Sequence, residues 1–285
     1  MLMTAKLKME LKAFNGFLSW PGGKRRLLPQ FDPLLPDRVK TYYEPFLGGG
    51  AVALAIAPRC QNMVLSDKNA CLINSWQCVR EDPEQLSALI YRHKHRHERG
   101  GRGYFDYTRK EYDATRKAGD IWGMEAAARF IFLNKSCFNG SWRSNKKGNL
   151  TITLGNKCYV PIFEPVAARI ADAAIVDSTF HIIATAGRGD VVYLDPPYYE
   201  GFREIASEYG IGRFSEDDRA DMVQLARTAG SRGAIVIGSD IDSPYTRDLY
   251  TSAGFHCDGF EFTYCIGGQQ KSRNISRELI YHNLI

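Results

Sequence analysis

The chain has 285 residues, of which 44% are apolar, a composition typical of a globular protein with room for a sizeable buried core. No apolar run approaches the roughly 18 to 20 residues of a membrane span, and the N-terminal segment scatters Lys and Glu where a signal peptide is continuously apolar. We therefore expect a cytoplasmic protein that does not insert into a membrane, and the net charge of +5 mildly favours a polyanionic partner.

Short apolar runs alternate with helix-like stretches along much of the chain. We expect strands at 42–46, 63–65, 174–176, 191–194, 234–237 and 279–281. We expect helices at 51–57, 72–79, 125–132 and 217–229, the last of them after Ser215 as N-cap. Strands that alternate with helices predict an α/β fold with a doubly wound, mostly parallel sheet.

The stretch from about 81 to 159 breaks this alternation. It is rich in charge, glycine and aromatic residues, and it contains one clear apolar helix, at 124–133. We interpret it as an inserted lobe, 81–159, within an α/β domain formed by 1–80 and 160–285. Ligands of open α/β sheets bind at the carboxyl ends of the strands, so a lobe inserted there would cover the site.

Neither the histidines nor the cysteines predict a metal site. The basic run 92–102 contains three alternate histidines, but its Lys and Arg side chains would repel a cation, and a solvated or phosphate-contacting face is the simpler interpretation. The seven cysteines are odd in number and contain no C-x-x-C pair, which argues against a disulfide framework or a zinc site.

The segment VVYLDPPYYE, 191–200, carries the strongest chemical signal. A buried strand delivers Asp195, Pro196, Pro197 and Tyr198 at its carboxyl end, and the two prolines fix the backbone so that carbonyls project rigidly. A carboxylate, a fixed carbonyl and an aromatic ring provide the acceptors and the stacking face that a planar exocyclic amine requires. The alternative is an ordinary proline turn with Asp195 capping a helix and Tyr198 in the core.

The segment YYEPFLGGGAV, 42–52, predicts a second part of the site. Its glycines let a ligand approach the backbone at the start of a helix, and Asp67 follows the next strand, where a carboxylate can accept hydrogen bonds from both ribose hydroxyls. This pattern indicates an adenosine-bearing cofactor. Gly48, Gly50 and Ala53 also satisfy the dinucleotide fingerprint G-x-G-x-x-A, so a dinucleotide-dependent oxidoreductase stays open as an alternative.

A third segment, SWPGGK at 19–24, lies upstream of the glycine-rich strand. Trp20 is placed to pack on a cofactor and Lys24 to meet a carboxylate. Dinucleotide binding explains neither this segment nor the one from Asp195 to Tyr198.

Together these segments resemble the Dam-like, alpha-group DNA adenine N6-methyltransferases, which carry W-x-G-G-K, P-F-x-G-G-G, D-x-N, a target-recognition lobe and D-P-P-Y in this order. Further similar pieces are LSDKNACLIN (65–74), FLNKSCFNGSWRSNKKG (132–148), FSEDDRADMVQLA (214–226) and SRELIYHN (276–283). The resemblance covers the chain from about Leu18 to Asn283. It implies a Rossmann-like class I methyltransferase fold, with S-adenosylmethionine as cofactor and double-stranded DNA as partner.

The resemblance also implies roles for individual residues. The cofactor site would comprise Trp20, Lys24, Phe46, Gly48, Gly50, Asp67 and Asp195, with Lys24 reaching the methionine carboxylate. The catalytic set would be Asp195, Pro196, Pro197 and Tyr198, and the DNA-reading hairpin would contribute Phe138, Asn139, Arg143 and Asn145.

The implied reaction is direct transfer of a methyl group to N6 of a flipped adenine, with no covalent enzyme intermediate. The family's N-x-P-F-G is replaced by 150–155 here, and Ser19 stands where GATC-specific relatives often carry a basic residue, so GATC is only a first expectation for the recognition sequence. A cytosine-N4 enzyme would carry Ser or Thr at Asp195, and a protein-glutamine enzyme Asn. A noncatalytic DNA-binding relative also stays open, and the sequence, although compatible with a monomer, does not fix the oligomeric state.

Overall fold

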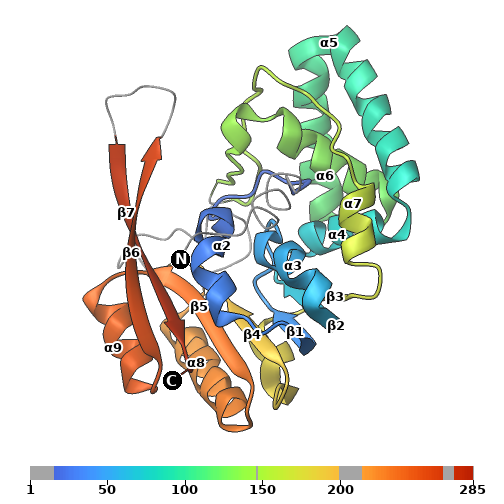
Figure 1. Cartoon of the computed structure of the whole chain (residues 1–285). Coiled ribbons are helices and arrows are strands. Elements are labelled where there is room, and N and C mark those ends of the chain that lie inside the picture. Colours follow the sequence, from blue (N-terminus) through green and yellow to red (C-terminus); the bar gives the residue numbers. More distant parts are fainter. Residues whose placement is uncertain (1–15, 146, 199–213, 266–272, 285) are drawn as a thin grey trace.

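A seven-stranded sheet forms the centre of the computed structural model, which describes residues 16–145, 147–198, 214–265 and 273–284 (Figure 1). From edge to edge the strands are β3 (Ala174–Asp177), β2 (Cys60–Asp67), β1 (Val39–Glu44), β4 (Val191–Leu194), β5 (Ile235–Ile241), β7 (Arg273–His282) and β6 (His256–Cys265). The first five are parallel, whereas β7 is antiparallel to both of its neighbours. The strand order reverses between β1 and β4, which is where open α/β sheets bind their ligands.

The central strands are buried on both faces of the sheet. Tyr42 and Tyr193 enter one hydrophobic core, whereas their chain neighbours Tyr43 and Val192 enter the other. This alternation follows from the two-residue period of a strand and explains why these strands are apolar almost throughout. The sheet is therefore the middle of three layers, as a doubly wound fold requires.

Helices cover both faces. The first core receives α2 (Leu28–Phe31), α3 (Ala51–Ile56), α4 (Ala70–Glu81), α5 (Pro83–Lys117), α6 (Met124–Ser136) and α7 (Glu164–Arg169), and the second receives α8 (Glu216–Ser231) and α9 (Pro244–Ser252). Short 3-10 turns lie at Lys24–Leu27, Asp32–Leu34, Ala57–Arg59, Phe138–Gly140 and Phe180–Thr185. Among the helices of the described residues, none combines the length and the apolarity needed to span a membrane.

The structure confirms the α/β class, the mostly parallel sheet and the positions of the six expected strands. β1 ends at Glu44, two residues before the expected end, because Pro45 has no N–H for the ladder. Ser215 caps α8 as expected, and its capping box with Asp218 is complete. The sequence analysis missed α2, α7, α9 and β6.

Helix α5 corrects the expectation of a single clear helix between 81 and 159. It runs from Pro83 to Lys117 with one break at Gly101, whose φ is +50°. Its buried residues Leu86, Leu89, Ile90 and His93 follow the helical spacing i, i+3, i+4, i+7. The many charged residues between them concealed this stripe in the sequence. In Figure 1, α5 and α6 lie side by side and away from α8 and α9.

Candidate active site

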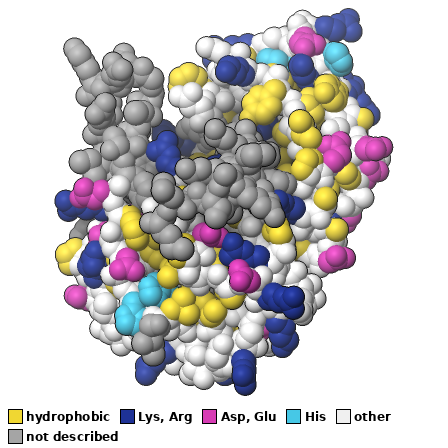
Figure 2. All heavy atoms as spheres, viewed as in Figure 1, with side chains coloured by type: hydrophobic (Ala, Val, Ile, Leu, Met, Phe, Trp, Pro, Cys, Tyr) yellow, Lys and Arg dark blue, Asp and Glu magenta, His cyan; other side chains and the backbone are white. Residues whose placement is uncertain are grey.

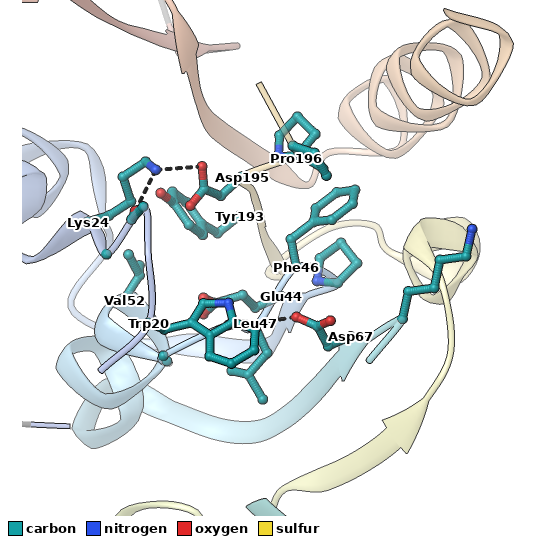
Figure 3. A pocket seen from close by; sticks show the side chains of 18 of the residues that line it. Trp20, Lys24, Glu44, Phe46, Leu47, Val52, Asp67, Tyr193, Asp195 and Pro196 are labelled. Carbon is teal, nitrogen blue, oxygen red and sulfur yellow. Dashed lines mark hydrogen bonds and ion pairs between the residues drawn. The ribbon is translucent and has the colours of Figure 1, made fainter. Parts of the chain in front are cut away.

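A cavity of about 360 Å³ lies at the carboxyl ends of β1, β2 and β4, where the strand order reverses. All the residues expected to bind the cofactor or act in catalysis line it: Trp20, Lys24, Phe46, Gly48, Gly50, Asp67, Asp195, Pro196, Pro197 and Tyr198. Figure 3 shows Lys24 and Asp195 at one end of the cavity and Trp20 and Asp67 at the other. The structure therefore brings three segments distant in the sequence into one site.

The glycine turn between β1 and α3 packs between the rings of Trp20 and Trp76. Gly50 has a φ of +63°, and a Cβ atom there would lie 2.5 Å from the ring of Trp76. Gly48 has a φ of +45°, and its Cβ would lie 2.9 Å from the ring of Trp20. Trp76 also donates its indole N–H to the Gly48 carbonyl at 3.1 Å. Both the backbone angles and the close rings therefore require glycine at these positions.

Asp67 is held at the end of β2 by backbone donors. Its two carboxylate oxygens accept N–H groups from Gly48 and Asn69, each at 2.9 Å. Burial raises the pKa of the Asp67 carboxyl to about 6. Each carboxylate oxygen has a second lone pair, so this side chain can still accept hydrogen bonds from a ligand.

Glu44, at the end of β1, also lines the cavity, and the sequence analysis missed it. Its side chain is buried and accepts the Tyr42 hydroxyl at 2.6 Å. Burial raises the pKa of the Glu44 carboxyl to about 8. Its position could have identified it: Glu44 stands directly before Pro45, at the carboxyl end of its strand, as Asp67 and Asp195 do.

Asp195 stands one residue beyond β4, opposite Lys24. The Lys24 ammonium lies 2.9 Å from Asp195 Oδ1 and donates to the Gly22 carbonyl at 2.7 Å (Figure 3). Ser239 of β5 donates its hydroxyl to the same Oδ1 at 3.1 Å. Burial raises the pKa of the Asp195 carboxyl to about 6, and the opposing effect of Lys24 is smaller. Lys24, expected to face a cofactor carboxylate, here faces a carboxylate of the protein.

Tyr198 closes the same end of the cavity. Its ring centroid lies 4.6 Å from the Lys24 ammonium, and its hydroxyl donates to Glu278 of β7. Burial raises the pKa of the Tyr198 hydroxyl well above its usual value. The sequence analysis gave Glu278 no role, because it lies 80 residues farther along the chain than Tyr198.

Three phenylalanines form an aromatic cluster beside the glycine turn. Phe46 stacks on Phe180 with a centroid separation of 6.5 Å and meets Phe214 edge-on at 5.6 Å. All three line the cavity, but the sequence analysis expected only Phe46. The other two rings follow β3 and precede α8, so the sheet topology brings them to this edge.

The four residues expected to contact DNA lie outside the cavity, on the segment after α6. Phe138 and Asn139 are exposed, and Asn139 has a φ of +51°, which is unusual for a residue other than glycine. Arg143 is also exposed. The Asn145 side-chain oxygen accepts the backbone N–H groups of Lys147 and Asn149, so it stabilises the turn of this hairpin.

Charged side chains of α5 fix the hairpin in place. The Asp113 carboxylate accepts the Leu150 N–H at 3.0 Å, and Arg109 donates to the Leu150 carbonyl at 2.9 Å. Arg116 donates to the Gly148 carbonyl at 2.5 Å. The hairpin's geometry thus depends on a helix more than 30 residues earlier.

Comparison with known proteins assigns the chain to a family. A model of the D12 class N6 adenine-specific DNA methyltransferases matches residues 20–259, which include the whole cavity and the hairpin. The chain belongs to this family of adenine-specific DNA methyltransferases. The match replaces the dinucleotide-dependent oxidoreductase considered above, because one family model accounts for both the glycine turn and Asp195–Tyr198.

Relatives of this methyltransferase include type II methyltransferases and DNA adenine methylases. Type II methyltransferase M1.LlaDCHI of Lactococcus lactis subsp. cremoris is 29% identical, over 99% of both chains. The DNA adenine methylase of Vibrio cholerae is 30% identical over 85% of this chain and 87% of its own. Type II methyltransferase M.MjaIII of Methanocaldococcus jannaschii is 30% identical over the same shares of the two chains.

In this methyltransferase, direct contacts of Ser19 and Trp20 connect the wall of the cavity to α6 and the hairpin. The buried Asn134 of α6 accepts the Ser19 N–H at 2.8 Å and donates to the Ser19 carbonyl at 2.9 Å. Next to it, the Trp20 ring lies 6.4 Å from the ring of Trp142, a buried residue of the hairpin. The wall of the cavity and the base of the hairpin are therefore packed together.

The basic run 92–102 of this methyltransferase is mostly exposed, as expected of a solvated face, but His93 is buried. His93 is hydrogen-bonded to the Tyr104 hydroxyl at 2.8 Å and stacks on Phe132 at 5.1 Å. Burial lowers the pKa of the His93 imidazole to about 4, so this side chain is neutral and belongs to the core. Within the described ranges, no group of three or more His, Cys, Asp or Glu residues is arranged to hold a metal ion.

Proposed function

We propose that this enzyme transfers a methyl group from S-adenosylmethionine to N6 of an adenine flipped out of duplex DNA, within a short site such as GATC. The observation that carries the proposal is the shared cavity. Asp195 and Tyr198 line the same space as the Gly48–Gly50 turn and Asp67. An acceptor site for an amine and an adenosine-type site thus lie within reach of each other.

The chemistry of the cavity suits S-adenosylmethionine, which would supply an electrophilic methyl group on a sulfonium cation. Asp67 and Asp195, whose pKa values are raised only to about 6, give the cavity two carboxylates at neutral pH, and carboxylates stabilise a nearby positive charge. Asp67 retains lone pairs for the ribose hydroxyls, and the cluster of Phe46, Phe180 and Phe214 offers faces for an adenine ring. Gly48 and Gly50 would let the ligand approach the backbone.

Asp195 would orient the adenine amine. Among the described residues, the contacts of Lys24 and Ser239 both reach Oδ1, so Oδ2 can accept an N–H of the amine. The carbonyl of Pro196 would accept the other N–H, and Tyr198 would stack on the base. These fixed acceptors would raise the electron density on N6 and stabilise the positive charge that develops there as the methyl carbon leaves sulfur.

DNA would be held by the inserted lobe, 81–159. Flipping an adenine costs about a few kcal/mol, which contacts with the phosphates and bases must offset. Lys and Arg side chains lie at the top of Figure 2, the region that α5 occupies in Figure 1. Arg143, exposed on the hairpin, would read a guanine edge.

The test is methylation of DNA with S-adenosylmethionine carrying an isotope-labelled methyl group. We expect the label in N6-methyladenine after digestion to nucleosides and mass spectrometry, and not in N4-methylcytosine. Asp195→Ala protein serves as the control for contaminating activity. Absence of label from the wild-type reaction would contradict the proposal and favour a noncatalytic DNA-binding relative.

The recognition sequence needs a separate measurement. Genomic DNA from a methylation-free strain that expresses the enzyme would be sequenced with detection of modified bases. Methylation confined to GATC would support the proposed site. A different context would leave the proposed reaction intact and refute GATC as the recognition site.

A further inference from the structure

One buried guanidinium contacts the backbone of the catalytic turn. Arg219 of α8 is only 2% exposed, and burying a charged side chain is unfavourable unless its donors are paired. One terminal nitrogen donates to the fully buried Asp240 carboxylate of β5. The other donates to the Pro197 carbonyl at 2.6 Å. Arg219 thus ties the Asp195–Tyr198 turn to the neighbouring strand.

Among the described residues, few other hydrogen bonds hold the backbone of this turn. β4 ends at Leu194, so the residues that follow make no ladder hydrogen bonds of that strand. Pro196 and Pro197 have no N–H to donate. The Pro197 carbonyl immediately precedes Tyr198, so its orientation sets the direction in which the Tyr198 ring leaves the chain.

Asp240 keeps Arg219 in this orientation. Tyr250 of α9 donates its hydroxyl to the same Asp240 oxygen at 2.8 Å, so the carboxylate is fixed from two sides. The arrangement needs a guanidinium, because its terminal nitrogens point in fixed, divergent directions. An ammonium group at this place would meet Asp240 or the Pro197 carbonyl, but its single nitrogen would not hold both at these positions.

We propose that Arg219 is a positioning residue for methyl transfer, which fixes the Pro197 carbonyl and thereby the placement of Asp195 and Tyr198. Arg219 does not line the cavity, so it acts through the turn and not by touching substrate. This inference rests on the proposed function of the Asp195–Tyr198 segment. It adds to it a residue that no motif in the sequence singled out.

The test compares Arg219→Lys with Tyr250→Phe. The lysine keeps a positive charge beside Asp240 but loses a donor to the turn, so kcat should fall about 10- to 100-fold, with KM for S-adenosylmethionine and DNA changed less than about threefold. Tyr250→Phe removes a hydrogen bond from the same Asp240 and the longer, 3.5 Å contact of its hydroxyl with Arg219 Nη1, but it leaves the Arg219 nitrogen that donates to Pro197 in place. Its thermal stability should fall, whereas its kcat should stay within about twofold of wild type.

Hydrogen–deuterium exchange provides a readout that does not depend on catalysis. Peptides that end at Tyr198 should exchange faster in Arg219→Lys and at the wild-type rate in Tyr250→Phe. If Arg219→Lys does not fold, the double variant Arg219→Gln, Asp240→Asn removes both charges together, and it should show the same loss of kcat and the same faster exchange.

The outcomes separate this inference from the proposed function. Wild-type enzyme without adenine methylation contradicts the function, and the exchange measurement then still decides whether Arg219 fixes the turn. Equal exchange in wild type and Arg219→Lys, or an equal loss of kcat in Arg219→Lys and Tyr250→Phe, would overturn the positioning role.

Discussion

The cavity and the hairpin are built in different ways. The cavity lies at the ends of parallel strands: Asp67 is the last residue of β2, and Asp195 follows β4 directly. In the part of the chain that the structure describes, the hairpin pairs with none of the seven strands of the sheet, and its Leu150 backbone is held by Asp113 and Arg109 of α5. In the proposed function, methyl transfer thus takes place at the carboxyl ends of parallel strands of the sheet. DNA is read by a segment that a few charged side chains of α5 hold in place.

If this comparison is right, changes in the cavity and in the hairpin should affect different measurements. The largest effect is expected for Asp195→Ala, which should reduce methyl transfer at least about 1000-fold, because the carboxylate that orients the amine is lost. DNA affinity, measured in a filter or anisotropy assay, should stay near wild type, because it depends mainly on phosphate contacts elsewhere. Near-normal turnover would refute the proposed mechanism.

Arg143→Ala should change the selectivity for the DNA sequence, whereas Asp195→Ala changes the methyl transfer step. A bidentate contact between Arg and guanine contributes about 1–3 kcal/mol of discrimination, equivalent to roughly 5- to 150-fold. We expect this variant to lose selectivity at one guanine, measured as methylation of the true site and of each single-base variant at fixed salt. A uniform loss across all sites would instead identify Arg143 as a phosphate contact.

Asp113→Ala should have a smaller effect, because it loosens the hairpin without removing a reading side chain. Losing one charged hydrogen bond to Leu150 should weaken DNA binding about 3- to 10-fold and leave S-adenosylmethionine binding unchanged. Glu98→Ala, which removes an exposed carboxylate of the same helix, is the matched control. Similar losses in both variants would mean that charge matters and hairpin support does not.

The same contrast explains what the sequence could predict. Gly48, Asp67 and Asp195 were predictable because each lies at or shortly after the carboxyl end of an apolar strand and belongs to a local sequence pattern. Ser239 and Glu278 were not, because they reach the site from β5 and β7, more than 40 residues beyond Asp195. Their roles depend on which strands become neighbours, and periodicity does not determine that.

The hairpin was harder to predict than the cavity. Its motif suggested a DNA-contacting role for Asn145, yet the oxygen of that side chain accepts two backbone N–H groups of its own turn. Asp113 and Arg116, which hold the hairpin, were hidden in a helix whose charge concealed its apolar stripe. Local pattern thus indicates the segment that would read DNA in the proposed function, whereas long-range contacts determine which of its side chains are available.

The smallest expected effect is on the pH dependence of stability and concerns Glu44. It compares this buried acid of the cavity with Glu98, an exposed acid of α5. The folded-state pKa of the Glu44 carboxyl, about 8, lies above the ordinary value of 4.5. The stability that this group contributes is therefore fully present below the unfolded-state pKa and is lost as pH rises through the folded-state pKa. Glu44→Gln does not titrate, so its melting temperature relative to wild type should rise by about a few degrees between pH 5 and pH 9.

Differential scanning fluorimetry of the ligand-free proteins at closely spaced pH values measures this difference directly. Glu98→Gln, which removes one exposed charge on α5, controls for the change in net charge. A Glu44→Gln difference that stays flat, or falls with pH, would mean that Glu44 is ionised in the folded cavity throughout this range. The cavity would then hold a third permanent negative charge, and its attraction for a sulfonium cation would be independent of pH above about 6, where Asp67 and Asp195 also ionise.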